Sequence, residues 1–327
     1  MTEPGTSFDM LAILGPTASG KTRLAVALAE ELGGEIISAD SRQVFRGMDI
    51  GSGKDLHEYG QVPFHLIDIL DAGGEFSVFD FQRRFLRAFA DITVRRAVPI
   101  LCGGSGMYLD AALRGYRMVE VPHNGHLRAY LATKTDIELI DELCRLKPGQ
   151  HNSTDLLDRE RTVRAIEIAR GEIENRSACE PLLRLKTAVI GIHWEREALR
   201  RRITDRLRER LDNGMIEEVE RLYASGIAWE RLNYYGLEYR YVGAYLRGDM
   251  NRNDMFQRLN SSIHNFAKRQ GNWFRRMERH GVAINWIEGG GDQLAQAREI
   301  IRDSSIASQA SSRTMAEGRC IKINVGP

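Results

Sequence analysis

A glycine-rich loop near the start of the chain limits the possible fold more than any other feature. Residues 15–22, GPTASGKT, match the pattern G-x-x-x-x-G-K-[ST] in full. In such a loop, backbone N–H groups and the N-terminus of the next helix bind an anion, the lysine adds a positive charge, and the hydroxyl is placed for Mg²⁺. An apolar strand is predicted before the loop, and Leu24, Leu28 and Leu32 repeat at helical spacing after it. This context favours a phosphate-binding loop over a chance match in a glycine-rich turn.

Strands and helices alternate along the first part of the chain. This alternation is typical of an α/β fold with a parallel sheet. We therefore predict a P-loop NTPase-like parallel sheet core. The apolar runs that predict strands lie at 9–14, 33–40, 62–70, 97–104, 186–194 and 280–288, with a helical pattern at 77–96.

The pattern changes at residues 116–183, which are charged, helical in periodicity and free of predicted strands. We interpret them as a helical insertion within a discontinuous core, 1–115 and 184–302. Helical periodicity from 195 to 279 adds C-terminal helices to this core. Residues 303–327 are rich in Ser, Ala and Thr and show little periodicity, so we expect a disordered tail.

Charge and cysteine usage exclude several classes of protein. Lys and Arg number 46 against 45 Asp and Glu, a net charge of +1, which excludes an overall polycation. The four cysteines have spacings that match no zinc site or disulfide framework, so we expect a reduced, cytoplasmic protein. The start of the chain shows no signal-peptide pattern, and no run of about 18 apolar residues predicts a membrane span. The cysteines are Cys102, Cys144, Cys179 and Cys320.

Two other glycine-rich stretches are weaker phosphate-loop candidates. In Gly51–Asp55, Asp55 replaces the hydroxyl residue and no apolar helix follows, so a plain loop is the better interpretation. The stretch GGSG at 103–106 lacks the third glycine of a dinucleotide-binding fingerprint. Its position after a predicted strand still places Ser105 at the carboxyl edge of the sheet, where ligands bind.

The chain lacks one element of a phosphoryl-transfer enzyme, an Asp that closes an apolar strand and holds Mg²⁺. The strand at 97–104 ends without an acid, and Asp68 falls inside its strand. The strand at 33–40 does end in an acid, Asp40, followed by Ser41. Two interpretations are open: one of these residues caps a following helix, or Asp40 faces the ligand crevice and accepts a proton.

Four segments together resemble the tRNA dimethylallyltransferases, also called tRNA isopentenyltransferases. They are 15–54, FHLIDIL at 64–70, VPILCGGSGMYLDAALRG at 98–115 and AKRQGNWFRR at 267–276, and the similarity extends from about Leu11 to Trp286. The resemblance implies that the loop binds the diphosphate of dimethylallyl diphosphate with Mg²⁺, not ATP. It implies transfer of the dimethylallyl group to N6 of the adenosine beside the tRNA anticodon (position 37), with the base drawn out of its stack. No phosphoryl group moves, which explains the missing Asp.

The resemblance also implies roles for individual residues. It makes Asp40 the general base, with Ser105 and Lys21 as further catalytic residues and Thr22 as the magnesium ligand. It implies diphosphate binding by Gly15, Pro16, Thr17, Ala18, Ser19, Gly20, Lys21, Thr22 and Arg240. It implies tRNA binding by Asp40, Ser41, Arg42, Gln43, Ser105, Arg128, Arg161, Arg164, Lys268, Arg269 and Gln270.

A basic segment near the C-terminus fits this expectation. Between Arg252 and His280 there are seven Lys and Arg residues but only two acids, with Trp273 and Phe274 among them. Basic groups beside aromatic rings suit RNA backbone contact and base stacking. The alternative is a solvated helix face with a buried Trp. The arginine-rich stretch at 194–211 balances acids and bases more evenly, and we expect a mostly solvated helix there that can touch phosphate.

Three rival functions remain at this point. An adenylate dimethylallyltransferase would use free AMP, ADP or ATP as acceptor, but the helical insertion and the AKRQGNWF segment favour tRNA. A small-metabolite kinase is disfavoured by the missing Mg²⁺-binding Asp, and a non-catalytic RNA-binding module by the intact loop and Asp40. We expect the enzyme to act as a monomer.

Overall fold

The computed structural model describes residues 8–115, 120–148, 158–174 and 185–303. The chain divides into two compact units, one made of 1–114 and 184–327 and the other of 115–183. The expected disordered tail, apart from Asp303, lies outside the described residues. Within the described ranges, no helix is both long enough and apolar enough to cross a membrane.

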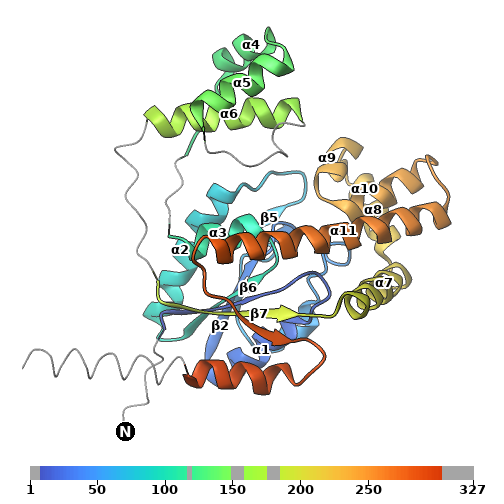
Figure 1. The fold of residues 1–327 in the computed structure, drawn as a ribbon. Coiled ribbons are helices and arrows are strands. Elements are labelled where there is room, and N and C mark those ends of the chain that lie inside the picture. Colours follow the sequence, from blue (N-terminus) through green and yellow to red (C-terminus); the bar gives the residue numbers. More distant parts are fainter. Residues whose placement is uncertain (1–7, 116–119, 149–157, 175–184, 304–327) are drawn as a thin grey trace, which may run out of the picture. The chain divides into compact units, whose positions relative to one another are not determined.

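The larger unit is built on a six-stranded sheet in the order β4–β2–β6–β1–β7–β8, and all paired neighbours are parallel. Helices α1 (Lys21–Leu32) and α2 (Val78–Val94) connect its first strands (Figure 1). This confirms the predicted α/β fold with a parallel core. The strands are β1 (Met10–Leu14), β2 (Gly34–Ala39), β4 (Phe64–His65), β6 (Val98–Gly103), β7 (Thr187–His193) and β8 (Asn285–Glu288).

Strand β1 shows why the sheet is covered on both faces. Every residue of β1 is buried, and side chains alternate between two apolar clusters. Met10, Ala12 and Leu14 belong to one cluster, and Leu11 and Ile13 to the other. A continuous apolar run is what a parallel strand requires when helices pack on both faces.

The strand predicted at 62–70 is broken in the structure. Only Phe64–His65 (β4) joins the main sheet, whereas Leu70–Asp71 (β5) pairs with β3 (Phe45–Arg46) in a separate two-stranded sheet. Leu66 and Asp68 between them have φ values of +65° and +54°, which an extended strand cannot adopt. The apolar pattern predicted burial correctly but not this backbone reversal.

The second half of the larger unit is mainly helical, as predicted. Helix α11, of 28 residues, begins where the Asn251 side chain accepts a hydrogen bond from the Asp254 N–H. Residues 293–303, after β8, are also helical, which the sequence did not predict. The helices are α3 (Gly106–Leu113), α7 (Arg196–Asp212), α8 (Met215–Ala224), α9 (Trp229–Tyr234), α10 (Leu237–Leu246) and α11 (Arg252–Arg279).

The smaller unit contains helices α4 (Gly125–Ala132), α5 (Asp136–Leu146) and α6 (Arg159–Glu174). Its described residues include no strand. A small apolar cluster holds the helices together, formed by Leu131, Leu139, Leu143 and Ile166.

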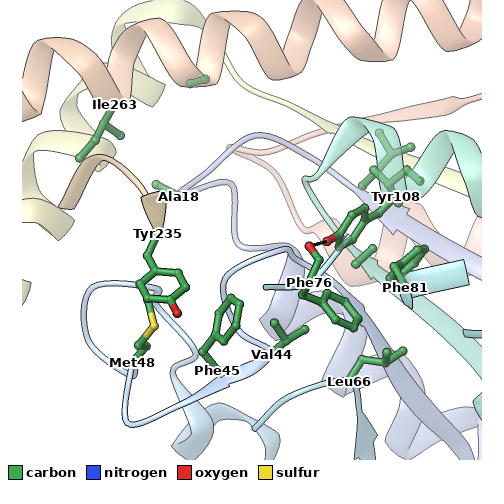
Figure 2. Packing of buried hydrophobic residues seen from close by; sticks show 14 of the residues in the cluster. Ala18, Val44, Phe45, Met48, Leu66, Phe76, Phe81, Tyr108, Tyr235 and Ile263 are labelled. Carbon is green, nitrogen blue, oxygen red and sulfur yellow. Dashed lines mark hydrogen bonds between the residues drawn. The ribbon is translucent and has the colours of Figure 1, made fainter. Parts of the chain in front are cut away.

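An apolar cluster supports the start of α3 (Figure 2). The Phe81 and Tyr108 rings stack with centroids 4.3 Å apart, and the Tyr108 hydroxyl donates a hydrogen bond to the Phe76 carbonyl at 3.3 Å. Tyr108 lies in the first turn of α3, shortly after Ser105. This packing fixes the place from which the Ser105 side chain projects.

The loop Gly51–Asp55 is structural, as predicted. The Glu218 carboxylate accepts hydrogen bonds from the N–H groups of Asp49, Ile50 and Gly51 at 2.6–3.0 Å, and from the Tyr239 hydroxyl at 3.0 Å. Lys54 is buried, and its ammonium donates to the Phe45 carbonyl at 2.7 Å and pairs with Asp49 and Asp68. Lys54, which resembles a phosphate-binding lysine in the sequence, therefore makes only structural contacts within the described chain.

Candidate active site

The loop between β1 and α1 has its carbonyls held by side chains from elsewhere in the chain. Arg202 Nε donates to the Ala18 carbonyl at 2.8 Å, and Trp194 Nε1 to the Ser19 carbonyl at 3.0 Å. Ala18 and Gly20 have φ values of +62° and +89°. No side chain of the described chain caps α1 at Gly20, so the N–H groups of its first turn can receive an anion. This geometry fits the anion cradle that the sequence predicts, and anion binding itself stays a prediction.

The Lys21 ammonium lies where the cradle meets the carboxyl edge of the sheet. Burial lowers the pKa of Lys21 below its ordinary value; Cys102 and Asp40 act to raise it, and Arg206 acts to lower it. Among the described residues, its ammonium makes one long hydrogen bond, 3.5 Å to the Pro16 carbonyl, and no ion pair at contact distance. A partly buried cation in such surroundings is poised to bind an anion.

Helix α7 is mostly solvated, as expected, and it also contributes a row of arginines to this region. Arg202, Arg206 and Arg210 are four residues apart and so lie along one side of the helix. Arg202 bonds the cradle directly, and Arg206 and Arg210 are close enough to shift the pKa of Lys21. Only the spacing of four could have revealed this face in the sequence.

The inner members of this row are partly neutralised by carboxylates. Arg206 pairs with Asp55, and Arg210 Nη1 lies 3.8 Å from Glu238 Oε1. Burial, followed by the neighbouring Arg206, lowers the pKa of Arg210 to about 10. Its Nε is buried and has no hydrogen-bond partner within the described part of the chain. The cluster remains net positive, which favours an anionic ligand.

The ends of β2 and β6 bring Asp40 and Ser105 together. The two strands are parallel neighbours with Ala39 opposite Gly103. Ser105 Oγ accepts a hydrogen bond from the Ser41 N–H at 3.1 Å, and the Ser105 N–H donates to the Ala39 carbonyl at 3.2 Å. Two sequence-predicted site residues thus meet at one point of the sheet edge.

The helix-cap interpretation of Asp40 and Ser41 is wrong. Residues 41–44 form turns, not a helix. Asp40 Oδ1 accepts a hydrogen bond from the Arg42 N–H at 2.8 Å, and no described group donates to Oδ2. One carboxylate oxygen therefore fixes the side chain, and the other is available to a ligand.

The other residues of the 41–43 segment differ in their surroundings. The Arg42 guanidinium lies 5.5 Å from the centroid of the exposed Tyr234 ring, at the surface. Gln43 is buried; its Oε1 accepts from Ser38 Oγ at 2.8 Å and its Nε2 donates to the Gly53 carbonyl at 3.1 Å. Arg42 is thus accessible to a ligand, whereas the Gln43 amide is engaged inside the protein.

Helix α11 carries the basic segment and contacts the cradle through Gln270. Its apolar face is buried, and Lys268 and Arg269 are exposed. Gln270, by contrast, is buried: its Oε1 accepts from the Thr17 N–H, and its Nε2 donates to the Gly104 carbonyl, both at 2.9 Å. Trp273 is half-buried and packs on Gly106. The helix therefore has a solvated basic face and a half-buried Trp273, and RNA contact by Lys268 and Arg269 stays a prediction.

Arg240 is exposed on α10, with its guanidinium 5.9 Å from the Tyr241 ring centroid. Within the described ranges, no hydrogen bond or ion pair joins it to the cradle. Its contact with the diphosphate stays a prediction.

In the smaller unit, a buried carboxylate anchors two of the predicted tRNA-binding arginines. Glu167 accepts two hydrogen bonds from Arg128, both 2.9 Å, one from Arg164 at 3.1 Å and one from the Asn124 N–H at 3.0 Å. Burial alone would raise the pKa of Glu167, but these hydrogen bonds outweigh it and hold the pKa at about 2. Arg161 is exposed, three residues before Arg164.

The described residues contain no group of three or more His, Cys, Asp or Glu side chains that could hold a metal ion by themselves. Thr22, half-buried in the first turn of α1, offers a single hydroxyl oxygen. This donor set suits Mg²⁺, which is commonly bound by one or two protein oxygens together with phosphate oxygens and water.

Comparison with known proteins gives a consistent result. A family model described as IPP transferase matches residues 43–277, and one described as isopentenyl transferase matches residues 8–70. A protein of Trichlorobacter lovleyi named tRNA dimethylallyltransferase 2 is 64% identical over 299 residues, 91% of this chain and 98% of its own length. A protein of the same name from Pelobacter propionicus is 66% identical over 298 residues, 91% and 95% of the two chains.

Solved structures agree with these relatives. The full-length tRNA isopentenylpyrophosphate transferase of Bacillus halodurans is 30% identical, with a TM-score of 0.68 over 94% of this chain and 99% of its own. A eukaryotic dimethylallyltransferase acting on tRNA, 22% identical, has the same fold, with a TM-score of 0.72 over 97% of this chain and 82% of its own.

Proposed function

The chain belongs to the tRNA dimethylallyltransferase family, and we propose that its cradle holds the diphosphate of dimethylallyl diphosphate while Asp40 handles the acceptor amine. The enzyme is thus a tRNA dimethylallyltransferase, and we propose N6 of the adenosine at position 37, beside the anticodon, as the acceptor. The observation that carries this proposal is the meeting of a cation-rich anion cradle with a carboxylate, at the ends of β1 and β2. We also propose that it acts in the cytoplasm, as a monomer.

The cradle would stabilise the leaving group. As the carbon–oxygen bond of the substrate breaks, negative charge grows on the diphosphate oxygen. Lys21 and the α1 N-terminus would neutralise that charge, with Arg202 and Arg206 on the same side. Arg202 would also hold the loop in shape through the Ala18 carbonyl. Mg²⁺, when bound at Thr22, would supply further positive charge for the diphosphate.

The acceptor side would align the amine and remove its proton. An adenine exocyclic amine is a weak nucleophile because its lone pair is delocalised into the ring. As the amine nitrogen forms its bond to the allylic carbon it gains positive charge, and Asp40 would accept the proton that it releases. The Ser105 hydroxyl, fixed by the Ser41 N–H, is placed to donate a hydrogen bond beside that carboxylate. The half-buried Arg42 and the exposed Tyr234 would contact the RNA around the extruded base.

A labelling experiment tests this function. Purified protein is incubated with Mg²⁺ and radiolabelled dimethylallyl diphosphate, and either tRNA or AMP. Label in tRNA, at the adenosine beside the anticodon after nuclease mapping, is the expected result. Label in AMP alone would instead support an adenylate dimethylallyltransferase, and no label in either acceptor would refute the proposal.

A further inference from the structure

One buried amide connects the two halves of the candidate active site. Gln270 lies in the interior face of α11, and its side chain reaches two loops that are far away in the sequence. Its Oε1 accepts the Thr17 N–H in the cradle, and its Nε2 donates to the Gly104 carbonyl beyond β6. A backbone N–H can only donate and a carbonyl can only accept, so these two partners fix the orientation of the amide.

The two partners belong to opposite sides of the proposed reaction. Thr17 lies in the loop that would hold the diphosphate. Gly104 directly precedes Ser105, whose hydroxyl accepts from the Ser41 N–H next to Asp40. A displacement of either loop would therefore stretch a hydrogen bond to the same side chain.

The contact is tight, which makes the connection stiff. A Cβ atom on Gly104 would lie only 2.4 Å from Gln270 Nε2 and 3.0 Å from the Gly15 carbonyl oxygen. One turn further along α11, Trp273 fills the space above Gly106, where a Cβ would lie 2.2 Å from the indole. The cradle, the turn before α3 and helix α11 thus leave no room for independent movement at this point.

We propose that Gln270 is a positioning residue that couples the diphosphate cradle to the acceptor turn at Ser105, and not a side chain that contacts RNA. The inference rests on the proposed function for the meaning of the two loops. Lys268 and Arg269, exposed immediately before it on α11, are free to bind RNA, whereas both polar atoms of Gln270 are already bonded inside the protein. An amide is needed because Glu would repel the Gly104 carbonyl and Met would bond neither partner.

The decisive measurement is the binding of inorganic pyrophosphate, with Mg²⁺, to the tRNA-free protein. For Gln270→Met we expect the dissociation constant to rise about tenfold, as for the loss of roughly one net hydrogen bond. We also expect the single-turnover transfer rate to fall at least tenfold at saturating tRNA and dimethylallyl diphosphate, because Ser105 and Asp40 lose their fixed position. The control is Gln257→Met, the same change at an exposed site of the same helix.

A residue that only contacts RNA would behave differently. Its replacement by Met would raise the KM for tRNA and leave the affinity for pyrophosphate, measured without tRNA, at the wild-type value. That result would overturn the inference. The inference would also be overturned by a second result. In it, Gln270→Met and Gln257→Met would lower the melting temperature equally, and Gln270→Met would keep the wild-type pyrophosphate binding and the wild-type transfer rate at saturating substrates.

A second variant approaches the same contact from the opposite side. Gly104→Ala pushes a methyl group against Gln270 Nε2, so we expect it to weaken pyrophosphate binding and slow transfer in the same way. In the double variant the two effects should be less than additive, because both break one contact. Full additivity would overturn the inference. If instead the wild-type protein fails to label tRNA, the proposed function is wrong, and this is seen before any variant is compared.

Discussion

Replacement of Asp40 by Asn tests the proposed chemistry most directly. Asn keeps the shape of the side chain and can still accept the Arg42 N–H hydrogen bond that Asp40 Oδ1 accepts at 2.8 Å. Because no helix begins at this residue, no cap is lost, and the free energy of unfolding should change by less than about 0.5 kcal/mol. Asn cannot take up a proton, so the single-turnover transfer rate should fall by roughly 10²–10⁴-fold, which corresponds to about 3–5 kcal/mol of barrier.

The same variant should bind pyrophosphate slightly better than the wild type. Asp40 acts on Lys21 as a nearby negative charge, and Asn removes that charge from beside the cradle. Slower transfer together with equal or tighter pyrophosphate binding is therefore the expected signature. Asp205→Asn, a change to an exposed carboxylate on α7, is the matched control. Transfer at the wild-type rate by the Asp40 variant would refute the general-base assignment.

Four other variants or conditions probe the same geometry. Arg206→Met should raise the KM for dimethylallyl diphosphate about tenfold and leave tRNA affinity unchanged, since it removes one charge-assisted contact to the diphosphate. An equal rise in the KM for dimethylallyl diphosphate and in the dissociation constant for tRNA would contradict the proposal that α7 faces the diphosphate. Burial lowers the pKa of Lys21 and a bound diphosphate should raise it, so pyrophosphate binding should take up protons and weaken as pH rises through the lowered value. Calorimetry in two buffers of different ionisation heat measures this uptake, with Lys21→Met as the baseline. The pKa of Glu167 is held at about 2, below its ordinary 4.5, so its contribution of about 3 kcal/mol should be complete above pH 4.5 and be lost as pH falls toward 2. The pH midpoint of acid unfolding, measured by circular dichroism, should therefore differ between Glu167→Gln and the wild type, because the variant lacks this pH-dependent contribution. Replacing Arg269 and Arg275 by Ala should weaken tRNA binding and reduce the salt slope of log K by about 0.9 for each phosphate that the protein no longer neutralises.

The loop at residues 15–22 and its flanking strand and helix could be predicted from the sequence because the pattern that marks them lies within one short stretch. The loop, the strand before it and the helix after it lie within residues 10–32, and Lys21–Leu32 forms the predicted helix. The sequence also placed Asp40 and Ser105 after two predicted strands, but only the family resemblance implied that they are close; the structure shows that the two strands are parallel neighbours. The roles assigned to these residues stay predictions.

What the sequence missed depends on tertiary packing. The Thr17–Gln270 hydrogen bond joins residues 253 positions apart, and no local pattern marks it. Helix α7 carries arginines on several of its sides, with acids among them, so the sequence did not show which arginines face the cradle. The break at Leu66 and Asp68 arises at positive φ values in residues other than glycine, which composition does not signal.

The backbone N–H groups that surround Glu218 form a site of the kind that binds phosphate, but this site is occupied by a carboxylate of the protein itself. Three consecutive N–H groups, from Asp49 to Gly51, converge on that carboxylate much as the N–H groups of an anion nest converge on an oxyanion. The fold thus contains a second site for an oxyanion, and its ligand is the Glu218 carboxylate of the same chain. Because this carboxylate is covalently attached, its effective concentration at the site favours it over a dissolved ion. Under the proposed function, the loop at residues 15–22 would bind a dissolved diphosphate, whereas the N–H groups of Asp49, Ile50 and Gly51 already bind Glu218. The same logic applies to other chains: a glycine-rich loop followed by lysine is a receptor for external phosphate only if no internal acid has already taken the place.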